Sequence, residues 1–176
     1  MIEELIKSNI RDVPNFPKKG IIFKDITPIL KNQELCTKIV EAFLEKLKGI
    51  EFDAVAGIES RGFLFGLMLA NKLNKPFIPI RKAGKLPYKT IQQSYNLEYG
   101  SAIIEIHEDA FDKNAKILIH DDLLATGGTV KASSELIYKL GGKVAGFTFL
   151  ISLDFLNGAS QLKNYSEEII TLASYH

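Results

Sequence analysis

Residues 117–129 read ILIHDDLLATGGT and pass within one short segment from an apolar run to an acidic pair and then to a glycine turn. The run Lys116–His120 is apolar at its centre and predicts a buried strand. Beyond the turn, the apolar spacing of Val130–Leu140 predicts a helix that ends at Gly141–Gly142. The segment therefore predicts a strand, a turn and a helix, the repeating unit of α/β folds.

The same alternation continues on both sides of this segment. Apolar residues recur at helical spacing over residues 35–47, and Gly49 would end that helix. The other predicted elements are strands at Phe52–Ile58, Pro76–Ile80 and Val144–Leu153, a helix at Gly62–Leu73, and a hairpin that pairs Ser94–Tyr99 with Ala102–His107. We predict an α/β fold with a central, mostly parallel sheet flanked by helices. Ligands bind beyond the carboxyl ends of such strands, so a site is expected just after Ile58, Ile80 and His120.

Length and charge narrow the class of protein. The 176 residues suit one domain over residues 1–176. The formal net charge of +1 gives no general attraction to nucleic acid or to anionic membranes, and no apolar run is long enough to span a bilayer. We expect a cytoplasmic protein with no nucleic-acid or membrane partner. Cys36, the single cysteine, lies at an apolar helical position and is expected to be a buried thiol, not a nucleophile.

The acidic pair and the glycine turn have complementary chemistry. Thr126–Thr129 leads into a helix, where free backbone N–H groups and the positive end of the helix dipole favour an anion. Asp121 and Asp122 would repel a phosphate there unless they accept hydrogen bonds from hydroxyls or approach a cation such as Mg²⁺. A ribose 5-phosphate meets both conditions, because its diol and its phosphate are well separated.

Alternative interpretations of this segment are weaker. The turn could be a structural strand-to-helix connection, with a solvated aspartate and a threonine as the helix N-cap. ATPases and nicotinamide enzymes are disfavoured, because neither Gly-x-x-x-x-Gly-Lys-Ser/Thr nor Gly-x-Gly-x-x-Gly follows a strand in this sequence.

The segment resembles the signature with which type I phosphoribosyltransferases bind phosphoribosyl pyrophosphate (PRPP). The resemblance implies the Rossmann-like fold of that family, with a flexible basic lid and hairpin at residues 81–107. It also implies that Asp121 and Asp122 hold the ribose hydroxyls. The residues expected to surround the 5′-phosphate are Ala125, Thr126, Gly127, Gly128 and Thr129.

Other segments resemble the adenine-using branch of this family: GIIFKDITP at Gly20–Pro28, GIESRGFLFG at Gly57–Gly66, RKAGKLP at Arg81–Pro87 and YNLEYG at Tyr95–Gly100. Arg61 and nearby backbone amides lie in a strand-to-helix turn that could bind a second anion. The basic stretch up to Thr90 suits a mobile lid over pyrophosphate, although both features could be solvated surface. The expected pyrophosphate contacts are Glu59, Ser60, Arg61, Arg81, Lys82 and Lys85, with Arg61 and Lys85 also catalytic.

The N-terminal segment, residues 1–30, is expected to bind the base. Phe23 could stack on a purine while backbone groups near Ile22 and Lys24 read its edge, although the sequence alone favours Phe23 as a core residue. Leu123 completes the expected adenine contacts.

The base preference has a local discriminator. Family members that use 6-oxopurines usually carry an acid at the position of Ala125, so hypoxanthine and guanine are disfavoured. The resemblance points to Glu98 as the catalytic acid/base group for the purine, with an exposed hairpin carboxylate as the alternative.

The resemblance implies a purine-salvage transferase that converts adenine and PRPP to AMP and pyrophosphate. Mg²⁺ is expected to arrive on PRPP without a direct protein site, and the chain is expected to form a homodimer. An enzyme of the same fold could instead use hypoxanthine, guanine, xanthine or a pyrimidine. A regulator could keep the PRPP pocket as a sensor, but the balanced charge offers it no basic face.

Residues Asp154–His176 match no chemistry and are expected to serve packing.

Overall fold

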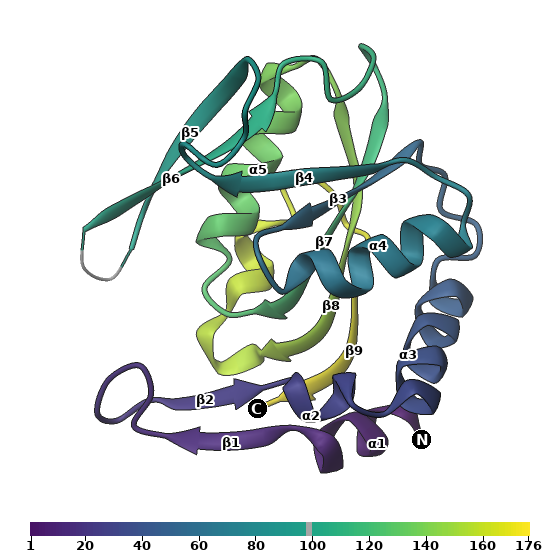
Figure 1. The fold of residues 1–176 in the computed structure, drawn as a ribbon, viewed down its shortest axis with the longest axis vertical. Helices are drawn as coiled ribbons and strands as arrows, with labels where there is room; N and C mark the ends of the chain where they lie inside the picture. The colour runs from purple at the N-terminus through teal and green to yellow at the C-terminus, as the bar shows by residue number, and fades with distance from the viewer. Residues whose placement is uncertain (98–99) are drawn as a thin grey trace.

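A seven-stranded sheet forms the centre of the protein, in a computed structural model that describes residues 1–97 and 100–176 (Figure 1). Its strand order is β5-β6-β4-β3-β7-β8-β9. Strands β4, β3, β7, β8 and β9 are parallel, whereas β6 is antiparallel to both β4 and β5. The strands are β3 (Ala54–Ile58), β4 (Phe77–Lys82), β5 (Thr90–Asn96), β6 (Ser101–His107), β7 (Lys116–Leu124), β8 (Lys143–Leu153) and β9 (Ile169–Tyr175).

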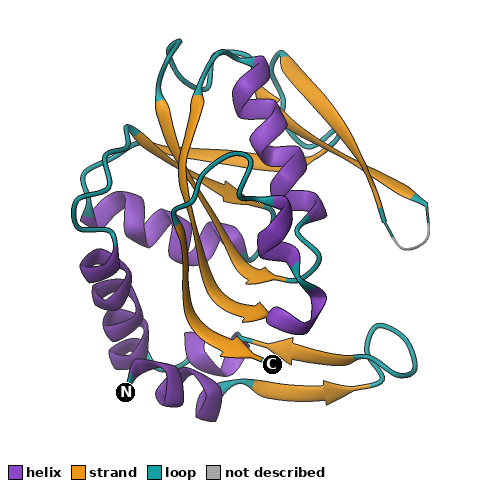
Figure 2. Ribbon diagram, turned by 180° about the vertical axis from the view of Figure 1, so that it is seen from behind, coloured by secondary structure: helices purple, strands orange, loops and turns teal. Residues whose placement is uncertain are grey.

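Helices cover both faces of the sheet. Figure 1 shows α4 (Gly62–Lys72) in front of the strands with α3 (Gln33–Lys46) beside it, and Figure 2 shows α5 (Gly128–Lys139) on the opposite face. The two faces correspond to two buried clusters. Val55 of β3 packs in the cluster with α3 and α4, whereas Ala54 and Ala56 belong to the cluster with α5. This alternation follows from the two-residue period of a strand.

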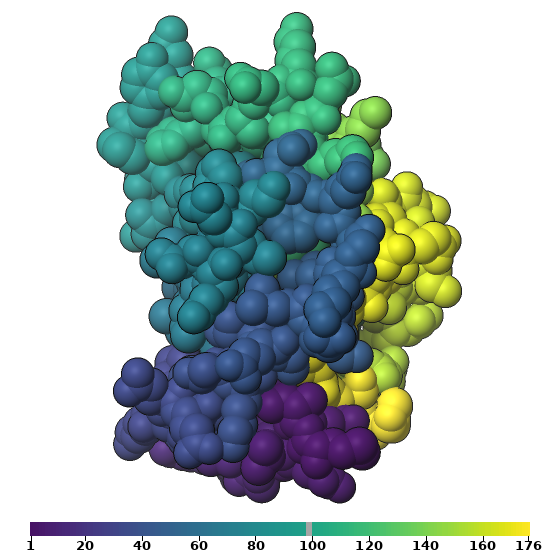
Figure 3. All heavy atoms as spheres, turned by 90° about the vertical axis from the view of Figure 1, so that its right-hand side faces the viewer, coloured from purple at the N-terminus to yellow at the C-terminus, as the bar shows by residue number. Residues whose placement is uncertain are grey.

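The N-terminal segment packs at one end of the molecule. It contains α1 (Ile2–Asn9), α2 (Thr27–Leu30) and an antiparallel hairpin of β1 (Arg11–Pro14) with β2 (Ile22–Asp25). Ser174 N in β9 donates a hydrogen bond to Glu3 Oε1 at 3.2 Å, so the two ends of the chain meet. Figure 3 shows the N-terminal residues in purple beside the C-terminal residues in yellow.

The predicted alternation of strands and helices is confirmed, with corrections at its edges. Strand β7 extends to Leu124, beyond its predicted end at His120. The C-terminal stretch is more structured than predicted, because it forms two 3₁₀ turns, η1 (Asp154–Leu156) and η2 (Gly158–Gln161), and a sheet strand. Cys36 is buried as predicted, and burial raises the pKa of its thiol. Within the described residues, no helix has the length and apolar character to cross a membrane.

Candidate active site

The acidic pair lies inside strand β7. Pairing with β8 places Asp121 opposite Phe149 and Leu123 opposite Ile151. The prediction that the strand ends before the aspartates was wrong, because the backbone stays in the sheet while the side chains become polar. The continuous strand fixes both carboxylates on the rigid part of the fold, near the carboxyl ends of the parallel strands.

Arg61 reaches the acidic pair from the N-terminus of α4. Its Nε lies 3.0 Å from Asp122 Oδ2, a contact between residues far apart in the sequence. This ion pair lacks hydrogen-bond alignment, and Asp122 Oδ2 is a buried atom with no hydrogen-bond partner among the described residues. Such an oxygen can accept a hydrogen bond from a ligand hydroxyl.

Burial raises the pKa of both carboxyl groups. For Asp122, burial outweighs the Arg61 guanidinium, which acts in the opposite direction on the pKa. For Asp121, burial and the charge of Asp122 raise the pKa well above its ordinary value. Asp121 Oδ1 also accepts a hydrogen bond from Asp122 N at 2.8 Å. The ionised pair is therefore destabilised in the empty protein, and hydroxyl donors or a cation would relieve this cost.

Glycines allow α4 to approach the sheet closely beside this pair. A Cβ atom at Gly62 would lie 2.9 Å from His120 O and 3.0 Å from Asp121 Oδ1. A Cβ at Gly57 would lie 2.9 Å from the carbonyl oxygen of Gly62. Real side chains do not tolerate such distances, so the glycines let the first turn of α4 bring Arg61 to the strand ends.

The loop Ala125–Thr129 connects β7 to α5. Gly127 is the N-cap residue of α5 and has φ 84°, a left-handed conformation that favours glycine. No side chain caps this helix. The threonine N-cap supposed in the structural alternative is therefore wrong, and the N–H groups of the first helical turn are available to an anion.

Glu59 organises the start of the basic loop. Its carboxylate accepts hydrogen bonds from Arg81 Nε at 3.2 Å and from Lys82 N at 2.9 Å. The sequence placed Glu59 among the expected pyrophosphate contacts. Its carboxylate holds Arg81, which is another of the expected pyrophosphate contacts. The peptide bond between Glu59 and Ser60 is cis.

Glu105 holds the middle of the same loop and was missed in the sequence. It is 2% exposed and accepts hydrogen bonds from Lys85 N at 2.9 Å and Leu86 N at 2.8 Å. Burial alone would raise its pKa, but these hydrogen bonds, with others from the loop and β5, hold the pKa below its ordinary value. The alternation with Ile104 and Ile106 placed Glu105 on a polar face, so no local signal marked it as buried.

Phe23 lies in strand β2 of the N-terminal hairpin, and its ring contacts Arg61, the N-cap residue of α4. Its ring centroid lies 5.2 Å from that of Phe16, and the Arg61 guanidinium carbon lies 4.7 Å from the centroid. Phe23 is only partly buried and belongs to neither core cluster. The preference of the sequence for Phe23 as a core residue was therefore wrong. Its aromatic ring is linked through Arg61 to the acidic pair.

The side chain of Lys24 is engaged within the protein. Its Nζ donates a hydrogen bond to Asp12 at 2.7 Å and lies 4.2 Å from the centroid of the Tyr175 ring. Ile22 is 57% exposed, and Leu123 packs against the core. A base contact at residue 24 would therefore use the backbone. Glu98, the expected purine acid/base group, lies outside the described residues.

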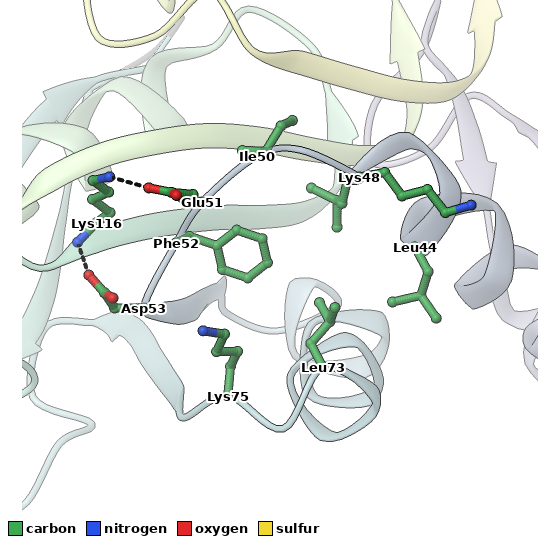
Figure 4. A pocket seen from close by; sticks show the side chains of 10 residues that line it. Leu44, Lys48, Ile50, Glu51, Phe52, Asp53, Leu73, Lys75 and Lys116 are labelled. Carbon is green, nitrogen blue, oxygen red and sulfur yellow. Dashed lines mark hydrogen bonds and ion pairs between the residues drawn. The ribbon is translucent and has the colours of Figure 1, made fainter.

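A second pocket can be separated from this site. It has a volume of about 450 Å³ and lies among the residues before β3 and at the start of β7 (Figure 4). Lys116 Nζ is paired with Glu51 at 2.9 Å, and Lys116 N donates to Asp53 at 2.7 Å. These residues lie at the amino ends of the strands, opposite the end that carries the acidic pair. The two acidic residues of this pocket, Glu51 and Asp53, therefore already accept hydrogen bonds from Lys116.

Comparison with known proteins identifies the family. Residues 25–171 match the model of the phosphoribosyl transferase domain. The chain is 50% identical over 175 residues to adenine phosphoribosyltransferase from Cytophaga hutchinsonii, covering 99% of this chain and 97% of the relative.

Solved structures agree with the sequence comparison. The crystal structure of adenine phosphoribosyltransferase from Thermoanaerobacter pseudethanolicus has a TM-score of 0.95 and 48% identity, covering 99% of this chain and 100% of that chain. The Saccharomyces cerevisiae enzyme, complexed with an imino-altritol bisphosphate and adenine, has a TM-score of 0.90 and 38% identity, covering 97% of each chain. The fold, the signature loop and these matches together place the chain in the phosphoribosyl transferase domain family.

Proposed function

We propose that this protein is a purine-salvage enzyme that transfers the 5-phosphoribosyl group of PRPP to adenine, forming AMP and pyrophosphate. The observation that carries the proposal is the acidic pair of β7, a half-buried Asp121 and a buried Asp122, shortly before an uncapped helix N-terminus. The near-full-length similarity to adenine phosphoribosyltransferases supports adenine as the base.

The sugar end of PRPP would occupy β7 and the loop before α5. Asp121 and Asp122 accept hydrogen bonds from the ribose hydroxyls, which supply the donors that Asp122 Oδ2 lacks. The loop Ala125–Thr129 and the N-terminus of α5 bind the 5′-phosphate. The carboxylates also favour the positive charge that develops on the ribose ring as the bond to pyrophosphate breaks.

The pyrophosphate end would meet the cations of α4 and the basic loop. Arg61 stands beside the acidic pair, and Arg81 is oriented by Glu59. Lys82 ends β4, and Lys85 lies on the following loop, which Glu105 fixes. Their positive charges stabilise the departing pyrophosphate, and closure of the loop would exclude the water that otherwise hydrolyses PRPP.

Mg²⁺ would enter with PRPP. Among the described residues, no group of three or more His, Cys, Asp or Glu side chains could hold a metal ion by itself. The carboxylates of Asp121 and Asp122 are the protein groups best placed to approach such an ion, because their charge is otherwise only partly compensated. The bound ion would supply positive charge to the pyrophosphate.

The base would lie against the N-terminal segment. Phe23 offers an aromatic face, and backbone groups at Ile22 and Lys24 read the edge of adenine. Ala125 leaves no carboxylate to serve a 6-oxopurine at the signature loop. Glu98 remains, by resemblance, the group that would handle the purine proton while N9 attacks the anomeric carbon.

We further propose a cytoplasmic homodimer. An apolar groove of about 520 Å³ between α3 and α4 supports self-association. Leu64 and Leu67, which line it, are 40% and 56% exposed. Exposed apolar side chains gathered in one groove are typical of interaction surfaces.

The function is tested by pyrophosphate release from Mg²⁺-PRPP with adenine, hypoxanthine, guanine, xanthine or uracil offered singly. We expect turnover with adenine alone, and loss of that turnover in Asp121→Asn/Asp122→Asn. Turnover with a different base would overturn the adenine assignment. PRPP binding without turnover on any base would favour a PRPP sensor.

A further inference from the structure

The chain after β8 returns to the signature loop. Turn η2 (Gly158–Gln161) lies against Ala125–Gly127, and in Figure 1 its yellow-green ribbon lies next to the loop that leads into α5. Leu162, the next residue, is fully buried and anchors the turn in the core. Nothing in the sequence connected these segments, because 30 residues lie between Gly127 and Gly158.

The contact is between two backbones. A Cβ atom at Gly158 would overlap the carbonyl oxygen of Ala125 and would lie 3.1 Å from Gly127 N. A Cβ at Gly127 would in turn lie 2.8 Å from Gly158 O. Neither glycine can gain a side chain without moving the loop, because the nearest atoms on both sides are backbone atoms. Gly158 therefore fixes how closely the C-terminal turn supports the loop.

A hydrogen bond completes the support. Gln161 Nε2 donates to Thr126 O at 2.7 Å. The peptide group is planar, so holding this carbonyl also holds the N–H of Gly127 in the opposite direction. Gln161 thereby sets the orientation of the last peptide plane before α5. Gln161, Thr126 and Gly128 also line one cavity of about 680 Å³, so the turn borders open space beside the loop.

The segment that carries the turn is also tied to α5. Tyr165 Oη donates a hydrogen bond to Glu135 of α5. Gln161 therefore ties the turn to the loop, and Tyr165 ties the segment after the turn to α5. A displacement of the turn would move the loop relative to the helix N-terminus that it precedes.

We propose that Gly158 and Gln161 are positioning residues for the 5′-phosphate of PRPP. They touch no substrate and act through Ala125, Thr126 and Gly127. The inference rests on the proposed role of this loop in phosphate binding. Preorganised N–H donors bind an anion more tightly than donors that must be ordered on binding, so loss of the support weakens binding of the phosphate end.

The test uses two variants and a matched control. Gln161→Met keeps the length of the side chain but removes the donor. Gly158→Ala forces the two backbones apart. Ser160→Ala is the control, because Ser160 lies in the same turn and its hydroxyl donates only to Asn157 O at 2.8 Å, within the turn.

The measurements are the steady-state constants for PRPP and adenine, the affinity for ribose 5-phosphate by calorimetry, and the melting temperature. For Gln161→Met we expect the KM for PRPP and the Kd for ribose 5-phosphate to rise about 3- to 10-fold, the range expected from loss of one hydrogen bond. The KM for adenine at saturating PRPP and kcat should change less than twofold. Gly158→Ala should raise the same two constants more strongly, and Ser160→Ala should leave all of them unchanged.

The outcomes separate this inference from the proposed function. If the wild-type protein binds PRPP and ribose 5-phosphate but Gln161→Met binds them with unchanged constants, the positioning role is wrong and the function stands. Equal increases in both KM values, with a lower melting temperature, would indicate a structural role only and would also overturn the inference. If the wild-type protein binds neither ligand, the proposed function itself fails. Should Gly158→Ala not fold, Gln161→Met decides alone.

Discussion

Single residues at the site are placed for binding at the expense of stability. Asp121 carries a carboxylate whose pKa is raised by burial and by its neighbour Asp122. A folded-state pKa above the unfolded value means that stability is lost as the pH rises through the folded pKa. Above the pKa of the unfolded chain the raised pKa of Asp121 therefore lowers the stability of the empty protein, which is typical of binding sites that await a ligand.

Asp121→Asn should therefore raise the free energy of unfolding while lowering the turnover of PRPP. The amide oxygen can still accept the hydrogen bond from Asp122 N, but an amide does not ionise, so the cost linked to the raised pKa of the carboxyl group is gone. We expect an increase of about 1 kcal/mol in the free energy of unfolding at pH 7.5, with a large loss of PRPP turnover. Urea unfolding and the pyrophosphate-release assay measure the two effects. The exposed Asp109→Asn should change neither, and a less stable Asp121→Asn would contradict the explanation.

The burial of His120 predicts that the folded protein loses stability at acidic pH. It is fully buried, its Nδ1 lies 2.9 Å from Thr148 Oγ1, and burial lowers its pKa to about 3. The unfolded chain, with a histidine pKa of about 6.5, binds more protons below that pH, so stability falls as the pH drops from about 6.5 towards 3. At pH 5.5 the wild-type protein should have lost about 1 kcal/mol through this group.

The His120 contribution is measured as the difference between wild type and His120→Asn in urea unfolding at pH 7.5 and 5.5. The variant should be less stable at pH 7.5 because of imperfect packing, but its stability should fall less on acidification. Parallel pH profiles for wild type and His120→Asn would show that His120 does not titrate in this way.

Among the elements, the basic loop between β4 and β5 depends on a carboxylate of β6. Glu105→Ala would leave Lys85 N and Leu86 N without their buried acceptor, at a cost of about 1–3 kcal/mol. We expect the loop to open locally, so trypsin should cleave after Lys85 about tenfold faster or more. Glu108→Ala removes an exposed acid near the same hairpin and should be cleaved at the wild-type rate. Unchanged cleavage in Glu105→Ala would show that other contacts hold the loop.

The elements themselves were predictable where their signals are local. The helical spacing of residues 35–47 and the apolar run before Asp121 predicted α3 and β7, because periodicity depends only on neighbouring residues. The hairpin of β1 and β2 was missed, since its strands are short and largely exposed. Glu105 and Gly158 were missed for a different reason. Their roles depend on contacts with residues distant in sequence, which periodicity does not report.

The same distinction applies to the candidate site. The signature loop and Arg61 could be named from the sequence, but their relation in space could not. The ion pair of Arg61 with Asp122 joins the start of α4 to β7, and that of Arg81 with Glu59 joins β4 to the turn after β3. These two arginines are therefore paired with carboxylates of the protein, in addition to any contact they make with a ligand. The two ion pairs form only because β4, β3 and β7 are neighbours in the folded sheet, which the sequence does not show.

At the scale of the whole molecule, ligand binding should reverse the instability stored at the site. A ligand that binds only the folded state adds about 2.7 kcal/mol at 100 times its Kd. For a chain of 176 residues this corresponds to a rise of about 5–10 °C in the melting temperature. Mg²⁺-PRPP should produce this rise in the wild-type protein at pH 7.5, measured by differential scanning calorimetry.

The double variant Asp121→Asn/Asp122→Asn should have a higher melting temperature than the wild type without ligand, but a smaller rise with ligand. Without ligand it should melt above the wild type, because burial outweighs the Arg61 ion pair in raising the pKa of Asp122, and the pKa of Asp121 is raised as well. With Mg²⁺-PRPP it should gain less than about 1 °C, because the ribose hydroxyls lose their charged acceptors. A full ligand-induced rise in the double variant would show that PRPP binds elsewhere. A rise in the wild type alone would link the stability of the whole fold to the two carboxylates of β7.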